Sequence, residues 1–296
     1  MSIKEHPPQV HTPVLLQATL DVMQPQRGER YLDLTAGYGG HATAFLEHTL
    51  DYATSVLVDR DQTTVPFLET LLKKGTTLLM TDFVAAARQL VEAGERFDLI
   101  LADLGVSSPQ LDRADRGFSF AHNGPLDMRM DQRTERTAGQ IVNEYTKDKL
   151  TDIIVRYGEE PRSLARKIAQ AIVERRPFVD TKSLAEVIKQ TIRRPRGKIH
   201  PATRTFQALR IEVNDELRQV ETLLPLLPHL LNKGGRVGII SFHSLEDRLV
   251  KRYFSDQTAS GYEAELAVLT KKPIAGTSDA HNPRARSAKL RVAVKK

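Results

Sequence analysis

The stretch Asp33-Leu-Thr-Ala-Gly-Tyr-Gly-Gly-His41 decides the fold, because it joins a short apolar segment to a helical one through closely spaced glycines. Arg30–Leu34 is brief and apolar and is bounded by polar residues, which is typical of a buried strand. His41–Leu50 is long enough for a helix. Glycine lets the backbone of such a turn approach a ligand closely, and the start of the helix offers free N–H groups there. The stretch predicts a strand–turn–helix unit with a ligand site at the turn.

The same alternation of short apolar segments and helical segments continues along the chain. It predicts βαβ units and a parallel sheet. The expected strands are Ser55–Val58, Thr77–Met80, Asp98–Leu104 and Arg236–Ser241, and the expected helices are Gln62–Lys73 and Val84–Ala93. Glu263–Thr270 and Ala288–Val294 alternate apolar and polar residues, which predicts two antiparallel strands. Lys233-Gly-Gly235 is expected to form a turn between a helix and the fifth strand.

A different pattern occupies the middle of the chain. Residues 115–205 show helical stripes, which include Leu150, Leu164 and Leu184, and no strand signal. Ser183 and Glu186 are spaced as a capping box. We therefore expect an α/β domain formed by residues 1–114 and 206–296, interrupted by an all-helical insertion at 115–205.

The positive charge is concentrated in this insertion. The chain has a net charge of +6 and a pI of about 9.4. Residues 115–205 hold 19 basic and 12 acidic side chains, whereas the remainder holds 24 basic and 25 acidic ones. Val187–Ile211 has seven basic residues and no acidic one. The segment is either a solvated helix end and loop or a surface that follows the phosphates of a nucleic acid.

The composition excludes several classes of protein. The 296 residues are 40% hydrophobic and 27% charged, which is typical of a globular protein. The absence of cysteine excludes disulfides, thiolate zinc sites and cysteine nucleophiles. No apolar run of about 20 residues predicts a membrane span, and no signal peptide is apparent, so we expect a cytoplasmic protein without a membrane partner. The nine histidines are scattered without an H-E-x-x-H motif, and no metal is expected.

An acidic residue after each of the first two strands bears on the ligand. Asp59 follows Gly39 by 20 residues, the offset at which a carboxylate can bind ribose hydroxyls. Asp33 stands four residues before Gly37, and the resulting D-x-x-x-G-x-G resembles the first motif of S-adenosylmethionine-dependent methyltransferases. A carboxylate suits the cationic methionine end of that cofactor and would repel a pyrophosphate. A nucleotide-dependent oxidoreductase and a purely structural turn remain alternatives.

Longer blocks carry a more specific resemblance. Asp103-Leu-Gly-Val-Ser-Ser-Pro-Gln-Leu-Asp112 is similar to the bacterial 16S ribosomal RNA cytosine-N4 methyltransferases, the small-subunit methyltransferase H or MraW family. One departure is that Ser107-Ser-Pro-Gln110 has one proline and no aromatic where many amine methyltransferases carry Pro-Pro-aromatic. The resemblance covers nearly the whole chain. The further matching blocks are Arg116–Phe120, Gly124–Asp131, His200–Arg210, Ser241–Arg248 and Asn282–Ser287.

The resemblance implies a fold, a cofactor and a substrate. The fold is a Rossmann-like class I methyltransferase sheet with the helical insertion. The cofactor is S-adenosylmethionine, and the substrate is the N4 amine of a cytidine in the decoding centre of 16S rRNA, within the 30S subunit or a late assembly particle. The implied cofactor contacts are Gly39, Gly40, His41, Asp59, Phe83, Asp103 and Gln110. Phe83 is equally well explained as a core residue.

The residues at the reaction site follow from the chemistry of the amine, whose lone pair is delocalised into the ring. A hydrogen-bond acceptor beside it would localise the lone pair and take up a proton. The candidates are Asp103, Ser107 and Ser108, with His243 and Glu246 as alternatives, and Asp103 can also serve as a cofactor anchor only. The expected RNA contacts are Arg194, Arg196, Lys198, Arg204, Arg210 and His243. A non-enzymatic RNA-binding assembly factor is the alternative outside the enzymes.

Overall fold

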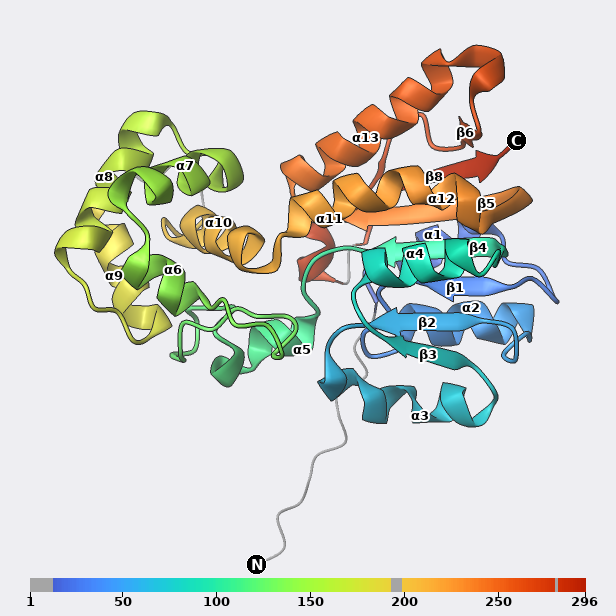
Figure 1. Cartoon of the computed structure of the whole chain (residues 1–296), viewed down its shortest axis with the longest axis horizontal. Coiled ribbons are helices and arrows are strands. Elements are labelled where there is room, and N and C mark those ends of the chain that lie inside the picture. The colour runs from blue at the N-terminus through green and yellow to red at the C-terminus, as the bar shows by residue number, and fades with distance from the viewer. Residues whose placement is uncertain (1–12, 193–198, 280–281) are drawn as a thin grey trace, which may run out of the picture. The chain divides into compact units, whose positions relative to one another are not determined.

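The chain divides into two compact units. The computed structural model describes residues 13–192, 199–279 and 282–296 (Figure 1). The first unit comprises Met1–Gly105 and Gln219–Lys296, and the second comprises Val106–Arg218. The second unit therefore begins earlier and ends later than the 115–205 expected from the sequence. Helix α10 (Thr203–Asn214) is the main reason, because its Phe206 and Leu209 belong to the second hydrophobic core.

The first unit is built on one mixed sheet (Figure 1). Its strand order is β3-β2-β1-β4-β5-β8-β6, and β7 also pairs with β8. The pairs among β1 to β5 are parallel, and β8 is antiparallel to β5, β6 and β7. The strands are β1 (Tyr31–Asp33), β2 (Val56–Asp59), β3 (Thr77–Met80), β4 (Phe97–Asp103), β5 (Leu231–Ser241), β6 (Leu266–Val268), β7 (Ile274–Ala275) and β8 (Lys289–Lys295). The expected parallel sheet with two antiparallel strands is thereby confirmed.

Helices cover both faces of this sheet, and the side chains of the strands alternate between them. In β1, Leu32 joins the core beneath α4, α12 and α13, whereas Tyr31 joins the core beneath α1, α2 and α3. In β4, Ile100 and Leu101 divide in the same way. This period of two arises from the pleat of a strand and explains why strands covered on both faces are continuously apolar. The helices are α1 (Leu16–Met23), α2 (Gly40–Thr49), α3 (Val65–Lys73), α4 (Phe83–Glu92), α12 (Leu227–Leu230) and α13 (Ser244–Ala259).

The expected turn at residues 233–235 is wrong, because the strand begins earlier. β5 starts at Leu231, which pairs with Phe97, and the next register pair joins Arg236 with Leu99. The extra residues form a bulge in which Gly234 has a φ of +79°. A bulge absorbs residues that the partner strand lacks, and glycine takes the left-handed conformation that this one requires.

The second unit is helical and has its own core. α7 packs against α8 and α10, and the stripes predicted at Leu150, Leu164 and Leu184 lie on α7, α8 and α9. The expected capping box at Ser183 is wrong, because α9 begins at Thr181 and the carboxylate of Asp180 accepts a hydrogen bond from the Ser183 N–H (2.9 Å). The helices are α5 (Ser108–Asp112), α6 (Ala138–Glu144), α7 (Lys147–Gly158), α8 (Arg162–Glu174), α9 (Thr181–Thr191) and α10.

Helix α11 (Glu216–Leu223) contains the boundary between the units. Short 3-10 segments complete the secondary structure. They are Gln62–Thr64, Ala114–Arg116, Leu224–Leu226, Gly261–Glu263, Gly276–Ser278 and Pro283–Ser287. Within the described ranges, every helix is too short or too polar to cross a bilayer.

Candidate active site

Four acidic residues gather where the parallel strands of the first unit end. Asp33, Asp59 and Asp103 are the last residues of β1, β2 and β4, and Glu246 lies in the first turn of α13, just after β5. Because the strands are parallel neighbours, their carboxyl ends meet at one edge of the sheet. Ligands of open α/β sheets bind at this edge.

The glycine turn after β1 is held by Asp59. The N–H of Gly37 donates to Asp59 Oδ2 (2.7 Å), and the N–H of Asp61 donates to Oδ1 (2.7 Å). Gly39 has a φ of +80°, which side-chain-bearing residues rarely adopt. A Cβ on Gly40 would stand 2.4 Å from Pro13 Cγ, so close packing alone requires that glycine. The predicted contacts Gly39, Gly40 and Asp59 thus lie together. The packing against Pro13 already explains a glycine at position 40, so its expected contact with the cofactor stays a prediction.

Asp33 lies beneath this turn and is almost completely buried. Its Oδ2 accepts a hydrogen bond from the Tyr31 hydroxyl (2.8 Å), and its Oδ1 accepts one from the Thr35 N–H (3.0 Å). Burial, and to a smaller degree the charge of Asp59, raise the pKa of Asp33 to about 6 against the opposing effect of those hydrogen bonds. A cationic ligand at this edge would stabilise the ionised form.

Of the four acidic residues at this edge, Asp103 has the fewest side-chain partners among the described residues. Its N–H donates to Thr35 Oγ1 (2.6 Å), which joins the ends of β1 and β4. Its Oδ1 is buried and has no hydrogen-bond partner among the described residues, while its Oδ2 lies 3.7 Å from Nδ1 of His41. Burial, followed by the charges of Asp33 and Glu246, raises the pKa of Asp103 well above its ordinary value. A buried carboxyl oxygen without a partner is costly unless a ligand supplies one.

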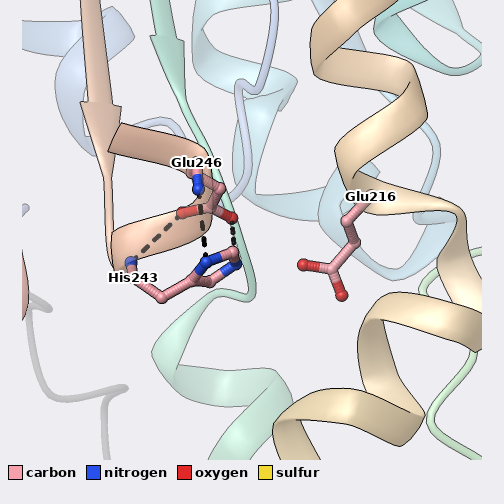
Figure 2. A group of neighbouring side chains, drawn as sticks. All are labelled: Glu216, His243 and Glu246. Atoms are coloured by element: carbon pink, nitrogen blue, oxygen red, sulfur yellow. Dashed lines mark hydrogen bonds and ion pairs between the residues drawn. The ribbon is translucent and has the colours of Figure 1, made fainter. Parts of the chain in front are cut away.

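The segment after β5 is organised by Glu246. Figure 2 shows its carboxylate beside the ring and backbone of His243. Glu246 Oε2 accepts a hydrogen bond from the Phe242 N–H (2.8 Å), and Oε1 lies 2.9 Å from His243 Nε2. The Glu246 N–H donates to Nδ1 of the same ring (3.4 Å). His243 therefore caps α13, and only 8% of its side chain is exposed. That burial argues against its expected contact with RNA, which stays a prediction.

Phe83 is the first residue of α4 and lies at the rim of a core. Asp82 caps the helix by accepting hydrogen bonds from the N–H groups of Val84 (3.0 Å) and Ala85 (2.9 Å). The Phe83 ring is partly buried and packs against the hydrophobic cluster over the sheet. Both sequence interpretations, a stacking surface for adenine and a core residue, fit this position.

The remaining expected site residues belong to the second unit. The Ser107 N–H donates to Oε1 of buried Gln110 (3.0 Å) at the start of α5, and Ser108 is the first residue of that helix. Gln110 therefore has a structural role besides the expected cofactor contact. Ser107 and Ser108 follow Asp103 closely along the chain, and their expected roles stay predictions.

Two of the expected RNA contacts lie in α10, and both are engaged within the second unit. Arg210 forms two hydrogen bonds with the carboxylate of Glu216 (2.8 and 2.9 Å), and its side chain is only 15% exposed. Arg204 is more exposed, and its Nη1 lies 3.7 Å from the Glu160 carboxylate. Arg194, Arg196 and Lys198 lie outside the described residues.

Sequence reasoning missed the residues that hold the site together. Tyr31 and Asp33 share a strand face because side chains alternate with a period of two, so their contact had a signal. No sequence pattern indicated the contacts of Thr35 and Val14. The Val14 carbonyl lies 3.1 Å from Nε2 of His41, and this contact joins segments that no local pattern connects.

The strand order and the glycine turn place a ligand site at the carboxyl edge of the sheet, and the family match identifies the protein as a methyltransferase that uses S-adenosylmethionine. Residues 8–296 match the MraW methylase family, and the chain belongs to that family.

Curated relatives are similar over nearly their whole length. The ribosomal RNA small subunit methyltransferase H of Synechocystis sp. is 46% identical over 293 residues, which cover 96% of this chain and 93% of the relative. The protein of the same name from Nostoc sp. is 47% identical, with 98% and 94% covered. That from Acidobacterium capsulatum is 45% identical, with 97% and 98% covered.

Proposed function

We propose that this protein transfers a methyl group from S-adenosylmethionine to the exocyclic N4 amine of a cytidine in the decoding centre of 16S rRNA. The names of the relatives support small-subunit ribosomal RNA as the substrate. The cytosine and its position rest on the resemblance of the blocks around Asp103 and Ser241. We propose that the substrate is 16S rRNA within the 30S subunit or a late assembly particle in the cytoplasm, because ribosomal proteins hold the RNA in its folded form in these particles.

The observation that supports this function most strongly is the group of buried carboxylates at the edge of the sheet. Among the described residues, no salt bridge neutralises Asp33. Burial raises the pKa values of Asp33, Asp59 and Asp103, so the charged form of each carboxylate is costly by itself. A ligand with positive charge would offset that cost, whereas the pyrophosphate of a nicotinamide cofactor would add to it. The oxidoreductase alternative is therefore disfavoured.

In the proposed reaction the protein mainly aligns the reactants. The cofactor supplies a methyl group already activated on a sulfonium, so orientation of the amine is the main requirement, and orientation can contribute about 7–11 kcal/mol. Asp33 and the Gly37–Gly39 turn would hold the methionine end, and Asp59 the ribose. Asp103 would accept the proton that the amine loses, through the Oδ1 that lacks a partner in the described structure.

The second unit would bind the RNA. Arg116 is buried, whereas the other basic side chains that the structure describes in this unit are exposed or half-buried. Phe242 is the candidate in the first unit for stacking on the base, because it is partly buried and stands between β5 and α13. Phe118 and Phe120 are two further aromatic candidates for this stacking. Phe118 is buried and Phe120 packs on Phe206, so both belong to the second core.

The test is mass mapping of 16S rRNA nucleosides from cells with the protein, without it, and with Asp103→Ala. We expect N4-methylated cytidine to disappear without the protein, and the variant to slow its formation by about 10²–10⁴-fold, the usual contribution of a proton acceptor. Asp21→Ala is the matched control, since this carboxylate is exposed on α1. Unchanged rRNA in the deletion would refute the function, and near-normal methylation by Asp103→Ala would refute the assigned acceptor alone.

A further inference from the structure

His41 and Asp103 form a pair whose hydrogen positions can be deduced. The Val14 carbonyl can only accept a hydrogen bond, so Nε2 of His41, 3.1 Å away, carries a proton. Nδ1 then offers a lone pair unless the ring is cationic, and it lies 3.7 Å from Oδ2 of Asp103. An ionised carboxylate facing a lone pair is unfavourable. The pair is therefore best satisfied by one proton, either on the carboxyl group or on Nδ1.

The surroundings favour keeping that proton. His41 is on α2 and only 7% exposed, and Asp103 ends β4. The charged or titratable groups that act on Asp103 from the neighbouring elements are Asp33 and Tyr31 on β1 and Glu246 on α13. These groups are acidic, so a second uncompensated negative charge is disfavoured until a cation arrives.

We propose that His41 and Asp103 together store one proton, release it when the cofactor's sulfonium binds, and recover one from the reacting amine. This inference rests on the proposed function, which makes Asp103 the acceptor, and it makes His41 a positioning residue that sets when Asp103 can accept.

The proton balance closes. Before transfer, the positive sulfonium faces a pair that has lost its proton and carries one negative charge. During transfer the S–CH₃ bond breaks, the N–CH₃ bond forms, and one N–H proton passes to Asp103. The products are a neutral thioether and a neutral pair. No net charge is created in the buried site, which is the arrangement that a low-dielectric environment favours.

Calorimetric titration of the full chain with S-adenosylmethionine and with S-adenosylhomocysteine tests this without RNA. The two compounds differ by the methyl group and its positive charge. Repeating each titration in buffers of different ionisation enthalpy gives the protons released per site. We expect binding of S-adenosylmethionine to release up to about one proton more than binding of S-adenosylhomocysteine. This excess should disappear as the pH is raised through the pKa of the His41–Asp103 pair, and the pH of half-maximal excess is its midpoint. Asp33 contributes to both titrations and cancels in the difference.

Two variants assign the proton. Asp103→Asn should abolish the excess. His41→Gln should shift its midpoint to lower pH, because glutamine keeps a donor for the Val14 carbonyl but cannot take up a proton. A cooperative unfolding transition in urea shows that each variant is folded. The proposal that His41 and Asp103 store a proton would be overturned by either of two results. One is that both compounds release equal numbers of protons from the unchanged protein, and the other is that the excess remains in Asp103→Asn. An unshifted midpoint in His41→Gln would remove His41 from it. Since no RNA is present, any of these results can occur whether or not rRNA is methylated.

Discussion

At the scale of single residues, Asp33 makes cofactor binding depend on pH. Burial raises its pKa from the ordinary 3.8 to about 6, and a neighbouring cation favours the ionised form. Binding of the cationic methionine end therefore releases a proton below about pH 6. The affinity for S-adenosylhomocysteine, which keeps that end but lacks the sulfonium, should fall as pH is lowered through that value. Calorimetry between pH 5 and 8 measures this. Asp33→Asn should bind more weakly above pH 6 and lose most of the pH dependence; a dependence of unchanged size would contradict the assignment.

Gly39 offers a test of the turn. Alanine at a φ of +80° is strained by about 1–2 kcal/mol, and its Cβ would stand 3.0 Å from Leu68 Cδ2. Gly28 is the matched control, because its φ is +85° but a Cβ there meets nothing within 4 Å. We expect both alanine variants to lower the free energy of unfolding in urea and only Gly39→Ala to lose cofactor affinity as well. Equal affinities would show that the turn tolerates a side chain.

At the scale of elements, the start of α9 can be tested, because the sequence predicts a cap at Ser183 and the structure places it at Asp180. Asp180→Ala removes the carboxylate that accepts from the Ser183 N–H and should cost about 0.5–2 kcal/mol in the free energy of unfolding. Ser183→Ala leaves this cap in place and should cost less than about 0.5 kcal/mol. Chemical denaturation of both variants gives the comparison, and the reverse order would restore the capping box expected from the sequence.

The sequence predicted elements well where a local pattern determines them. β3 was expected and found at residues 77–80, because its apolar run is bounded by polar residues on both sides. The start of β5 was missed because the bulge at Gly234 depends on its pairing with β4, which no local pattern reports. The acidic residues of the site were found because strand ends are readable in the sequence. The contacts of His41 were missed because they depend on how α2 packs.

At the scale of the whole molecule, the distribution of charge predicts how RNA binding depends on salt. Removing one basic side chain that binds a phosphate lowers the slope of log K against log salt by about 0.7–0.9. Arg194/Arg196→Ala should therefore lower the slope by roughly 1.5 if both residues bind phosphates. Lys251/Arg252→Ala is the control, since these side chains are exposed on α13 in the first unit. Filter binding to a 16S rRNA fragment measures the slopes, and equal slopes in the two variants would favour the interpretation of the segment as a solvated loop.

The place of β8 in the sheet has a consequence for biosynthesis. β8 follows every other strand along the chain, yet it lies between β5 and β6 and also pairs with β7. A nascent polypeptide therefore cannot finish its sheet until residues 289–295 have left the ribosomal exit tunnel, whereas the whole second unit emerges earlier. Translation that stops before residue 289 leaves β5 with an open apolar edge, and unpaired edges invite aggregation.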